Sequence, residues 1–497
     1  MSDLPRGPLA RWLLPAIILI YLVLGTLYAA YTPAWQAPDE PAHYNYIRHL
    51  AERHRFPILK PGDFPAAYLE EIKAARFPPE MGIEPIRYEF HQPPLYYVLA
   101  VPIYGLFGGS LLPLRLLSVV LGALLLLVVY WTVEALVPDR PSLALGTTAF
   151  VAFLPMHLAM TASVNNDILS ELLLAVMLLL TIRFLQHDLT RRDRGSETRL
   201  LVLLGITTGL GLLTKSSLYI VPVLVLAAIA ARKLWLEDGQ RPLRAGLQGL
   251  SVYLLPSLGL ALPWWLRNMA IYGGFDFLGL GRHDQVVVGQ LRTADFVAQF
   301  GLPRLLRDFV VTSFHSFWGQ FGWMGVLLDQ RLYQALVVLS ALAGIGFLVW
   351  FARIWRQRDT LPRWQWLAGG LLVLWAVLTL ASYAWYNTTF LQHQGRYLFR
   401  ALLPIGLGVA LGWREALRRT HALPLAGLFL LSAVLLRIAG WLPNWPLLMV
   451  IAAAVGLGAR YLLPRRFDPF LHAMPYLSLI LLDLASLFLF VVPQLAV

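Results

Sequence analysis

An acidic cluster near the start of the chain has the residue types needed for proton transfer or metal binding. In the run APDEPAHY, Asp39 and Glu40 are adjacent, and His43 follows Asp39 by four residues. On a helix, that spacing places Asp39 and His43 on one face, one turn apart. Such a group can deprotonate a hydroxyl group, or hold Mg²⁺ or Mn²⁺ through Asp39 and Glu40. The same residues also suit a plain helix start, where the helix dipole favours carboxylates.

Further candidates stand where polar residues meet apolar runs. In HQPPLYY, His91 and Gln92 precede two prolines, and Arg87 lies four residues before His91. Asp167 ends the run SVNND, and Lys215 lies beside hydroxyl side chains in LTKSS. A carboxylate at a bilayer boundary is costly and usually functional, and a lysine beside hydroxyl groups suits a phosphate. An aromatic belt, a helix cap and a snorkelling lysine would explain the same three patterns without a binding site.

Arginines on two other runs need anionic partners. Arg267 follows a pair of tryptophans, and Arg396 lies in QHQGRY between His393 and Tyr397. An arginine at a membrane boundary requires a carboxylate from another loop or the phosphate of a ligand. The candidate catalytic residues are therefore Asp39, Glu40 and Asp167. The candidate substrate-binding residues are His43, Arg87, His91, Gln92, Lys215, Arg267, His393, Arg396 and Tyr397.

The composition indicates the surroundings in which these residues act. Of the 497 residues, 58% are hydrophobic and only 14% are charged, and the mean hydropathy is +0.63. A soluble chain carries about a quarter charged residues, so most of this surface faces something other than water. The net charge is +12, and the arginines cluster between apolar runs, which indicates anionic lipid and not nucleic acid. Without cysteine, the chain has neither disulfides nor thiol chemistry.

Apolar runs of about 20 residues, the length that crosses a bilayer, predict an all-α integral membrane protein with about 13 spans. The expected spans are 11–31, 113–136, 142–161, 164–186, 199–214, 216–232, 246–271, 331–352, 364–386, 397–413, 422–440, 445–462 and 472–494. Arginines in short connections, such as Arg191 and Arg192, place the N-terminus in the cytoplasm under the positive-inside rule. All the candidate site residues then lie on the extracytoplasmic side.

Two long connections, 32–94 and 272–330, are expected outside the cytoplasm. The first contains two amphipathic stretches, 41–54 and 66–77, which suit helices that lie on the membrane surface. The apolar stretch 95–107 follows it. At about 13 residues it is too short to span the bilayer, so we expect an interfacial or re-entrant helix.

We expect two regions along the chain. Residues 1–413 contain all the candidate site residues and form the expected catalytic region. Residues 414–497 have few polar residues within their spans, which favours packing or lipid contact.

The sequence resembles the GT-C superfamily of membrane glycosyltransferases, in particular the protein O-mannosyltransferases and the lipid A aminoarabinose transferases. PDEPAHYNYIRHLAE and HQPPLYY carry the likeness, with QGRY further on, and it covers roughly residues 10–400. The resemblance implies a GT-C fold, a polyprenyl-phosphate sugar donor and inversion at the anomeric carbon. It also implies that Asp39 is the general base and Asp167 a second acidic residue, and that Lys215 and Arg396 hold the donor phosphate.

The expected function is transfer of a sugar from that donor to an acceptor hydroxyl, an activity of class EC 2.4, at the outer face of the plasma membrane. The acceptor belongs to a glycan, a lipid or a protein. Gln92 stands where the aminoarabinose branch has a lysine, which argues against that branch's substrate. A transporter of lipid-linked sugar and a polysaccharide ligase or polymerase are the alternatives. Transporters usually show paired halves and polar residues at mid-membrane, whereas here the polar residues lie at span ends.

Overall fold

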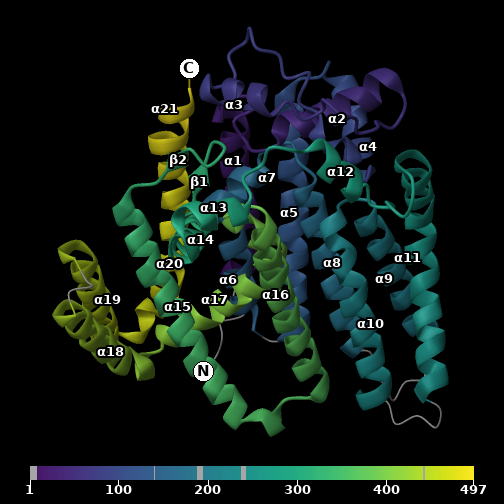
Figure 1. Cartoon of the computed structure of the whole chain (residues 1–497). Helices are drawn as coiled ribbons and strands as arrows, with labels where there is room; N and C mark the ends of the chain where they lie inside the picture. Colours follow the sequence, from purple (N-terminus) through teal and green to yellow (C-terminus); the bar gives the residue numbers. More distant parts are fainter. Residues whose placement is uncertain (1–7, 139, 187–193, 237–241, 440–442, 497) are drawn as a thin grey trace.

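Long helices lying side by side make up most of the molecule (Figure 1). The computed structural model describes residues 8–138, 140–186, 194–236, 242–439 and 443–496. The long helices are α1 (Pro8–Tyr31), α5 (Leu111–Leu136), α8 (Asp167–Gln186), α9 (Arg194–Leu212), α11 (Pro242–Tyr272), α15 (Gln330–Arg356), α16 (Arg363–Thr389), α17 (Leu402–Ala416), α18 (Arg419–Ile438), α19 (Asn444–Leu462) and α20 (Asp468–Ala485). The shorter elements are α2 (Glu40–Arg53), α3 (Ala66–Ala74), η1 (Tyr88–His91), α4 (Leu95–Leu106), α6 (Pro141–Ala152), α7 (Pro155–Thr161), η2 (Ser216–Ile220), α10 (Val221–Ala231), η3 (Arg232–Leu236), α12 (Leu280–Val286), α13 (Thr293–Phe300), α14 (Leu302–Trp318), β1 (Gln320–Phe321), β2 (Val326–Leu327), η4 (Arg358–Thr360), η5 (Gly395–Ala401), η6 (Arg465–Phe467), η7 (Ser486–Val491) and α21 (Val492–Leu495).

The expected all-α membrane fold is confirmed. Within the described ranges, ten helical segments are long and apolar enough to cross a bilayer, or eleven if α6 and α7 count as one broken span. These ten or eleven coincide with expected spans. The two remaining expected spans, 199–214 and 397–413, fall on α9 and α17, which do not qualify.

Local sequence explains where the expected spans break. The run 142–161 bends by 67° between α6 and α7, where Pro155 begins the second helix and cannot continue the hydrogen bonds of the first. The run 397–413 opens as the 3-10 helix η5, so the α-helix that follows has only 15 residues. That length is about 22 Å, short of a bilayer core.

The short helices α2, α3, α4 and α12 gather at one end of the long ones (Figure 1). Helices α2 and α3 confirm the two amphipathic helices expected at 41–54 and 66–77, and α4 confirms a short helix at 95–107. The second long connection, 272–330, forms α12, α13, α14 and a small antiparallel ribbon in which Gln320 pairs with Leu327. The first connection thus gives the site a framework of short helices, with η1 packed against α2.

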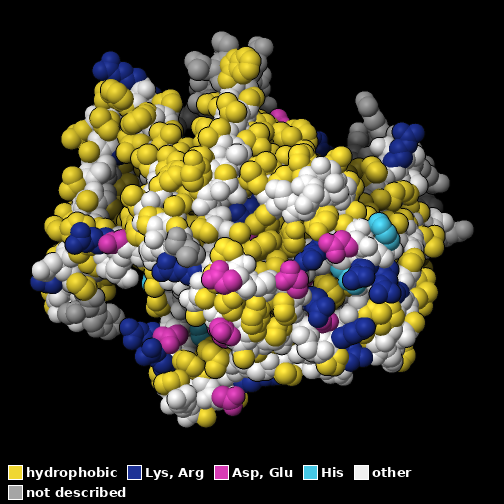
Figure 2. All heavy atoms as spheres, turned by 90° about the horizontal axis from the view of Figure 1, so that it is seen from above, with side chains coloured by type: hydrophobic (Ala, Val, Ile, Leu, Met, Phe, Trp, Pro, Cys, Tyr) yellow, Lys and Arg dark blue, Asp and Glu magenta, His cyan; other side chains and the backbone are white. Residues whose placement is uncertain are grey.

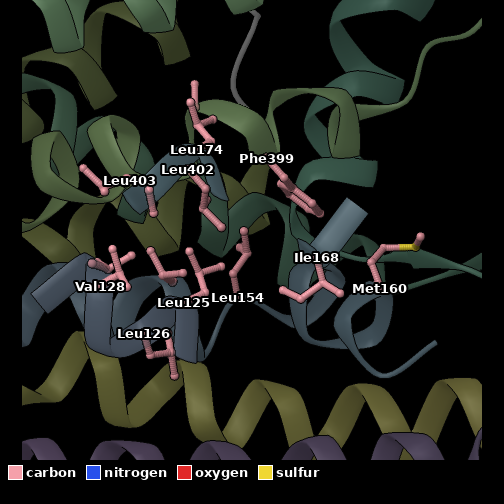
Figure 3. Close-up of a cluster of buried hydrophobic side chains, with 14 of the residues drawn as sticks. Leu125, Leu126, Val128, Leu154, Met160, Ile168, Leu174, Phe399, Leu402 and Leu403 are labelled. Atoms are coloured by element: carbon pink, nitrogen blue, oxygen red, sulfur yellow. The ribbon is translucent and has the colours of Figure 1, made fainter. Parts of the chain in front are cut away.

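Apolar side chains from distant segments hold the long helices together (Figure 3). Leu125 of α5, Leu174 of α8 and Leu402 of α17 converge there, and each is almost completely buried. Inside a membrane such packing stabilises through van der Waals contact, since lipid tails are as apolar as leucine. This core fixes the ends of α5, α8 and η5, which carry polar residues to the site.

Helices α18 and α19 lie to one side of the molecule (Figure 1). They pack against each other and form a small apolar cluster that includes Leu425, Phe429 and Leu457. Residue 413 lies within α17, so a helix runs across the expected boundary of the catalytic region. Arg191 and Arg192, which help to set the expected orientation, lie outside the described residues, as do residues 1–7.

A buried ion pair ties the first connection to the helix bundle. Arg115 of α5 donates from Nε and Nη2 to the two carboxylate oxygens of Glu40, at 2.8 and 2.6 Å. Both side chains are buried. The backbone amides of Val164 and Trp35 also donate hydrogen bonds to the Glu40 carboxylate, at 3.1 and 3.2 Å. The same guanidinium also donates to carbonyl oxygens just after α1, including that of Thr32 at 2.7 Å.

We expect Glu40→Gln to destabilise the fold strongly. Removing one member of a buried pair leaves the other charge uncompensated, which costs about 3–5 kcal/mol. Thermal unfolding of the purified protein in detergent measures the effect. Glu84→Gln is the control, because Glu84 pairs with Arg48 on the surface and such pairs contribute about 0–1 kcal/mol. An unchanged unfolding temperature for Glu40→Gln, with activity lost, would instead assign Glu40 to the chemistry.

Candidate active site

Asp39 lies at the start of α2, beside the buried Glu40, but in different surroundings. Its backbone is left-handed, with φ at 68°, which is uncommon for a residue other than glycine. The side chain is 27% exposed. Oδ1 accepts a hydrogen bond from the Tyr88 hydroxyl at 2.8 Å, and Oδ2 accepts one from Arg396 Nη2 at 2.7 Å. The two acidic neighbours are therefore divided between an interior ion pair and an accessible one.

The charge state of Asp39 follows from its partners. Burial raises the pKa of Asp39. The positive charge of Arg396 and the hydrogen bonds from Arg396 and Tyr88 outweigh burial, so the pKa is lowered overall. The carboxyl group is therefore ionised at neutral pH. Arg396 is itself oriented by Gln394, whose Oε1 accepts from Nε at 2.6 Å.

A second carboxylate–cation pair lies at the start of α8. Lys215 Nζ donates to Asp167 Oδ1 at 2.5 Å, and the two side chains are 21% and 33% exposed. Asn165 fixes the start of the helix by accepting from the Asp167 amide at 2.9 Å. Asn166 donates to the Thr214 carbonyl at 3.1 Å and so joins the loop before α8 to the loop that carries Lys215.

His43 lies among these pairs. Its Nδ1 is 2.8 Å from the Tyr97 hydroxyl. Burial lowers the pKa of His43, and Lys215 lowers it further, while nearby Glu89, Asp39 and Asp167 oppose the change. The imidazole is therefore neutral at neutral pH. The carboxylates of both pairs and Lys215 are close enough to His43 to act on its charge, so the two pairs belong to one polar site around this ring.

His91, Gln92 and Tyr397 have partners of different kinds. Burial, followed by the neighbouring ring of His283, lowers the pKa of His91 to about 3, so His91 carries no positive charge for a phosphate. The backbone carbonyl of Gln92 accepts a hydrogen bond from the Tyr46 hydroxyl at 3.1 Å. The side chain of Gln92 is buried. Tyr397 lies beside the Arg396 guanidinium, 5.6 Å from ring centre to charge.

Three predicted binding residues have partners outside this polar site. Arg87 pairs with Asp63 at 3.0 Å and is 44% exposed. Arg267 donates to the Pro57 carbonyl at 2.6 Å and stacks on a tryptophan of its own helix. His393 is buried against the ring of Phe309. The structure therefore does not bring Arg87, Arg267 and His393 to the carboxylate pairs.

Two residues of the site were not among the candidates. Arg115 is a lone cation inside an apolar run. Charged residues in such runs are rare without a partner, so its position in the sequence could have indicated a buried ion pair. Glu89 neighbours Tyr88 in η1, and its Oε2 is buried without a hydrogen-bond partner. Glu89 gave no signal beyond its place next to HQPP.

A divalent metal does not fit the residues present. The described part of the chain contains no group of three or more His, Asp or Glu side chains able to hold a metal ion. Arg115 fills both oxygens of Glu40, and Arg396 lies against Asp39. Cations in those positions repel a metal, so the reaction proposed below uses none.

The face of the molecule that carries α2, α3 and α4 mixes charges of both signs (Figure 2). Figure 2 views the molecule from the end that carries α2, α3 and α4, and acidic and basic side chains stand next to one another there between apolar areas. A site for an anionic lipid head group and a polar acceptor would need such a face.

Comparisons with known proteins report on the family and the fold. Residues 91–256 match the model of the family named dolichyl-phosphate-mannose-protein mannosyltransferase. The structure resembles ArnT from Cupriavidus metallidurans bound to undecaprenyl phosphate, with 16% identity and a TM-score of 0.52, over 96% of this chain and 76% of that one. No curated protein sequence matches the chain.

A second solved structure has the same fold. The oligosaccharyltransferase of Archaeoglobus fulgidus, tethered with an acceptor peptide, is 14% identical with a TM-score of 0.51. The match covers 96% of this chain and 55% of that one, so this chain spans about half the length of the archaeal enzyme. The family match covers residues 91–256, and the likeness to the two solved structures shows that the chain shares their fold.

Proposed function

We propose that the chain is an inverting glycosyltransferase that moves a sugar from a polyprenyl-phosphate donor to an acceptor hydroxyl at the extracytoplasmic face of the plasma membrane. The observation that carries the proposal is the arrangement of two carboxylate–cation pairs, Asp39–Arg396 and Asp167–Lys215, around His43 at the ends of spans. A lipid-linked donor suits a site at a bilayer boundary. ArnT, which shares the fold, was solved with undecaprenyl phosphate.

Asp39 has the features of a general base. The acceptor oxygen bonds to the anomeric carbon while its proton moves to the Asp39 carboxylate. The bond between that carbon and the phosphate oxygen breaks, and the electron pair leaves with polyprenyl phosphate. Tyr88 and Arg396 hold the Asp39 carboxylate in a fixed orientation. The carboxylate therefore loses little conformational entropy when the substrate binds. Attack from the face opposite the phosphate inverts the anomeric centre.

Lys215 and Arg396 are the cations available to the leaving phosphate. Charge builds on its oxygens as the bond breaks, and fixed cations in a site shielded from water offset that charge. Both cations form ion pairs with carboxylates. A phosphate therefore has to share Lys215 with Asp167, which keeps the site from holding the lipid product too tightly.

The first prediction concerns Asp39. Asp39→Asn removes the proton acceptor while it keeps the size of the side chain, so transfer should fall by at least about 100-fold, the lower range for general base catalysis. Purified protein in nanodiscs is supplied with synthetic polyprenyl-phosphate sugars and a cell-envelope extract as the source of acceptor. Release of free polyprenyl phosphate is then measured for wild type and variant side by side.

The outcomes separate the proposal from its rivals. Glu84→Gln, a surface change in the same connection, should keep wild-type turnover. Wild-type turnover by the Asp39→Asn variant would show that Asp39 is not the general base. Donor binding without turnover in any variant would favour a transporter of lipid-linked sugar.

The second prediction concerns pH. Arg396 lowers the pKa of Asp39, so the base form persists to low pH in wild type. Arg396→Gln removes that effect, and the acidic limb of the kcat/KM profile should move to higher pH because Asp39 then protonates more readily. Polyprenyl phosphate release between about pH 4 and pH 8 gives the profile. A limb that stays in place while kcat/KM falls equally at every pH would mean that Arg396 acts only on the phosphate.

A further inference from the structure

Glu89 is the carboxylate of the site that has no cation. In the described ranges, Asp39 pairs with Arg396, Glu40 with Arg115 and Asp167 with Lys215. The described structure gives the Glu89 side chain neither an ion pair nor a hydrogen bond, and its Oε2 is buried. A buried acceptor without a partner costs free energy, so native structures rarely retain one without a reason.

Glu89 lies next in sequence to a residue that contacts the proposed base. It follows Tyr88, whose hydroxyl donates to Asp39, in the short helix η1. Of the charged groups that act on His43 and on Tyr97, Glu89 acts most strongly. Those two side chains are hydrogen-bonded to each other. Glu89 therefore lies close to His43 and Tyr97, beside the region that the Asp39–Arg396 and Asp167–Lys215 pairs share.

The proposed reaction determines what occupies that region. With the base at Asp39 and the phosphate near Lys215, the sugar ring has to lie between them. We propose that Glu89 accepts a hydrogen bond from a hydroxyl group of the transferred sugar, and that it thereby selects the sugar. This inference rests on the proposed function, since it needs a lipid-linked sugar in the site.

The chemistry of the carboxylate excludes the other parts of the donor. A phosphate is anionic and is repelled by Glu89, and an isoprenoid chain offers no hydrogen. Sugar hydroxyls donate, and a hydrogen bond to an ionised oxygen is shorter and stronger than a neutral one. A site built to bind a hydroxyl also rejects an analogue that lacks it, because its own polar group then stays unpaired.

Paired binding measurements test the proposal. The probes are undecaprenyl phosphate and the same lipid carrying mannose, glucose or arabinose, each titrated into the full-length protein in nanodiscs. Wild type should bind at least one sugar-bearing lipid about 10- to 100-fold more tightly than the bare lipid. In Glu89→Leu that gain should vanish, while the affinity for the bare lipid changes less than about twofold. Glu89→Gln keeps one acceptor oxygen and should retain part of the gain.

The controls distinguish failure of this inference from failure of the proposed function. Glu80→Leu changes an exposed glutamate of the same connection and should behave as wild type. If wild type binds neither lipid, the proposed function fails. If wild type binds the sugar-bearing lipid more tightly and Glu89→Leu retains that gain, only the role of Glu89 fails. Equal loss for both lipids would make Glu89 a structural residue, and Glu89→Gln decides the question where the leucine variant does not fold.

Discussion

The buried pair between Glu40 and Arg115 is the constraint on which the site depends. It joins the start of α2 to α5, and through backbone contacts it also holds the end of α1 and the loop before α8. Residue 39 is therefore fixed by its neighbour, and its left-handed backbone is maintained by that anchor. Strained backbone persists only where the surroundings over-determine it, and such positions cluster at functional sites. The anchor explains why two adjacent acidic residues have different tasks.

Pairing of charges is the second principle of the site. Asp39 and Asp167 each hold a cation in a half-buried position, so Arg396 and Lys215 are oriented before any ligand arrives. Such preorganisation costs no rearrangement when charge develops on a leaving phosphate. It also limits the affinity for phosphate, because each cation is already partly neutralised. A transferase has to release its lipid product. A cation that is already paired with a carboxylate binds the product phosphate less tightly than an unpaired cation, so release is easier.

Much of the fold followed from periodicity and length. Hydropathy placed the spans, and α2, α3 and α4 formed where amphipathic or short apolar runs predicted helices. The misplaced span at 397–413 has a tertiary cause. A side chain on Gly395 would collide with the backbone of α14 at Ser313 and Phe317, and this close approach coincides with the 3-10 turn of η5. No local pattern reports a contact between segments about 80 residues apart.

That these candidate side chains come together was predictable from the sequence, but their pairings were not. Asp39, His43, Asp167, Lys215 and Arg396 share one centre, as expected for residues that lie at the same ends of their spans. Which cation pairs with which carboxylate depends on where α5 and η5 lie relative to the start of α2, and a single sequence contains no record of that arrangement. A carboxylate left over from pairing can be recognised only once every pair is known. An unpaired glutamate therefore cannot be identified from sequence patterns alone. A lone arginine in an apolar run is much easier to identify, because its position in the sequence already stands out.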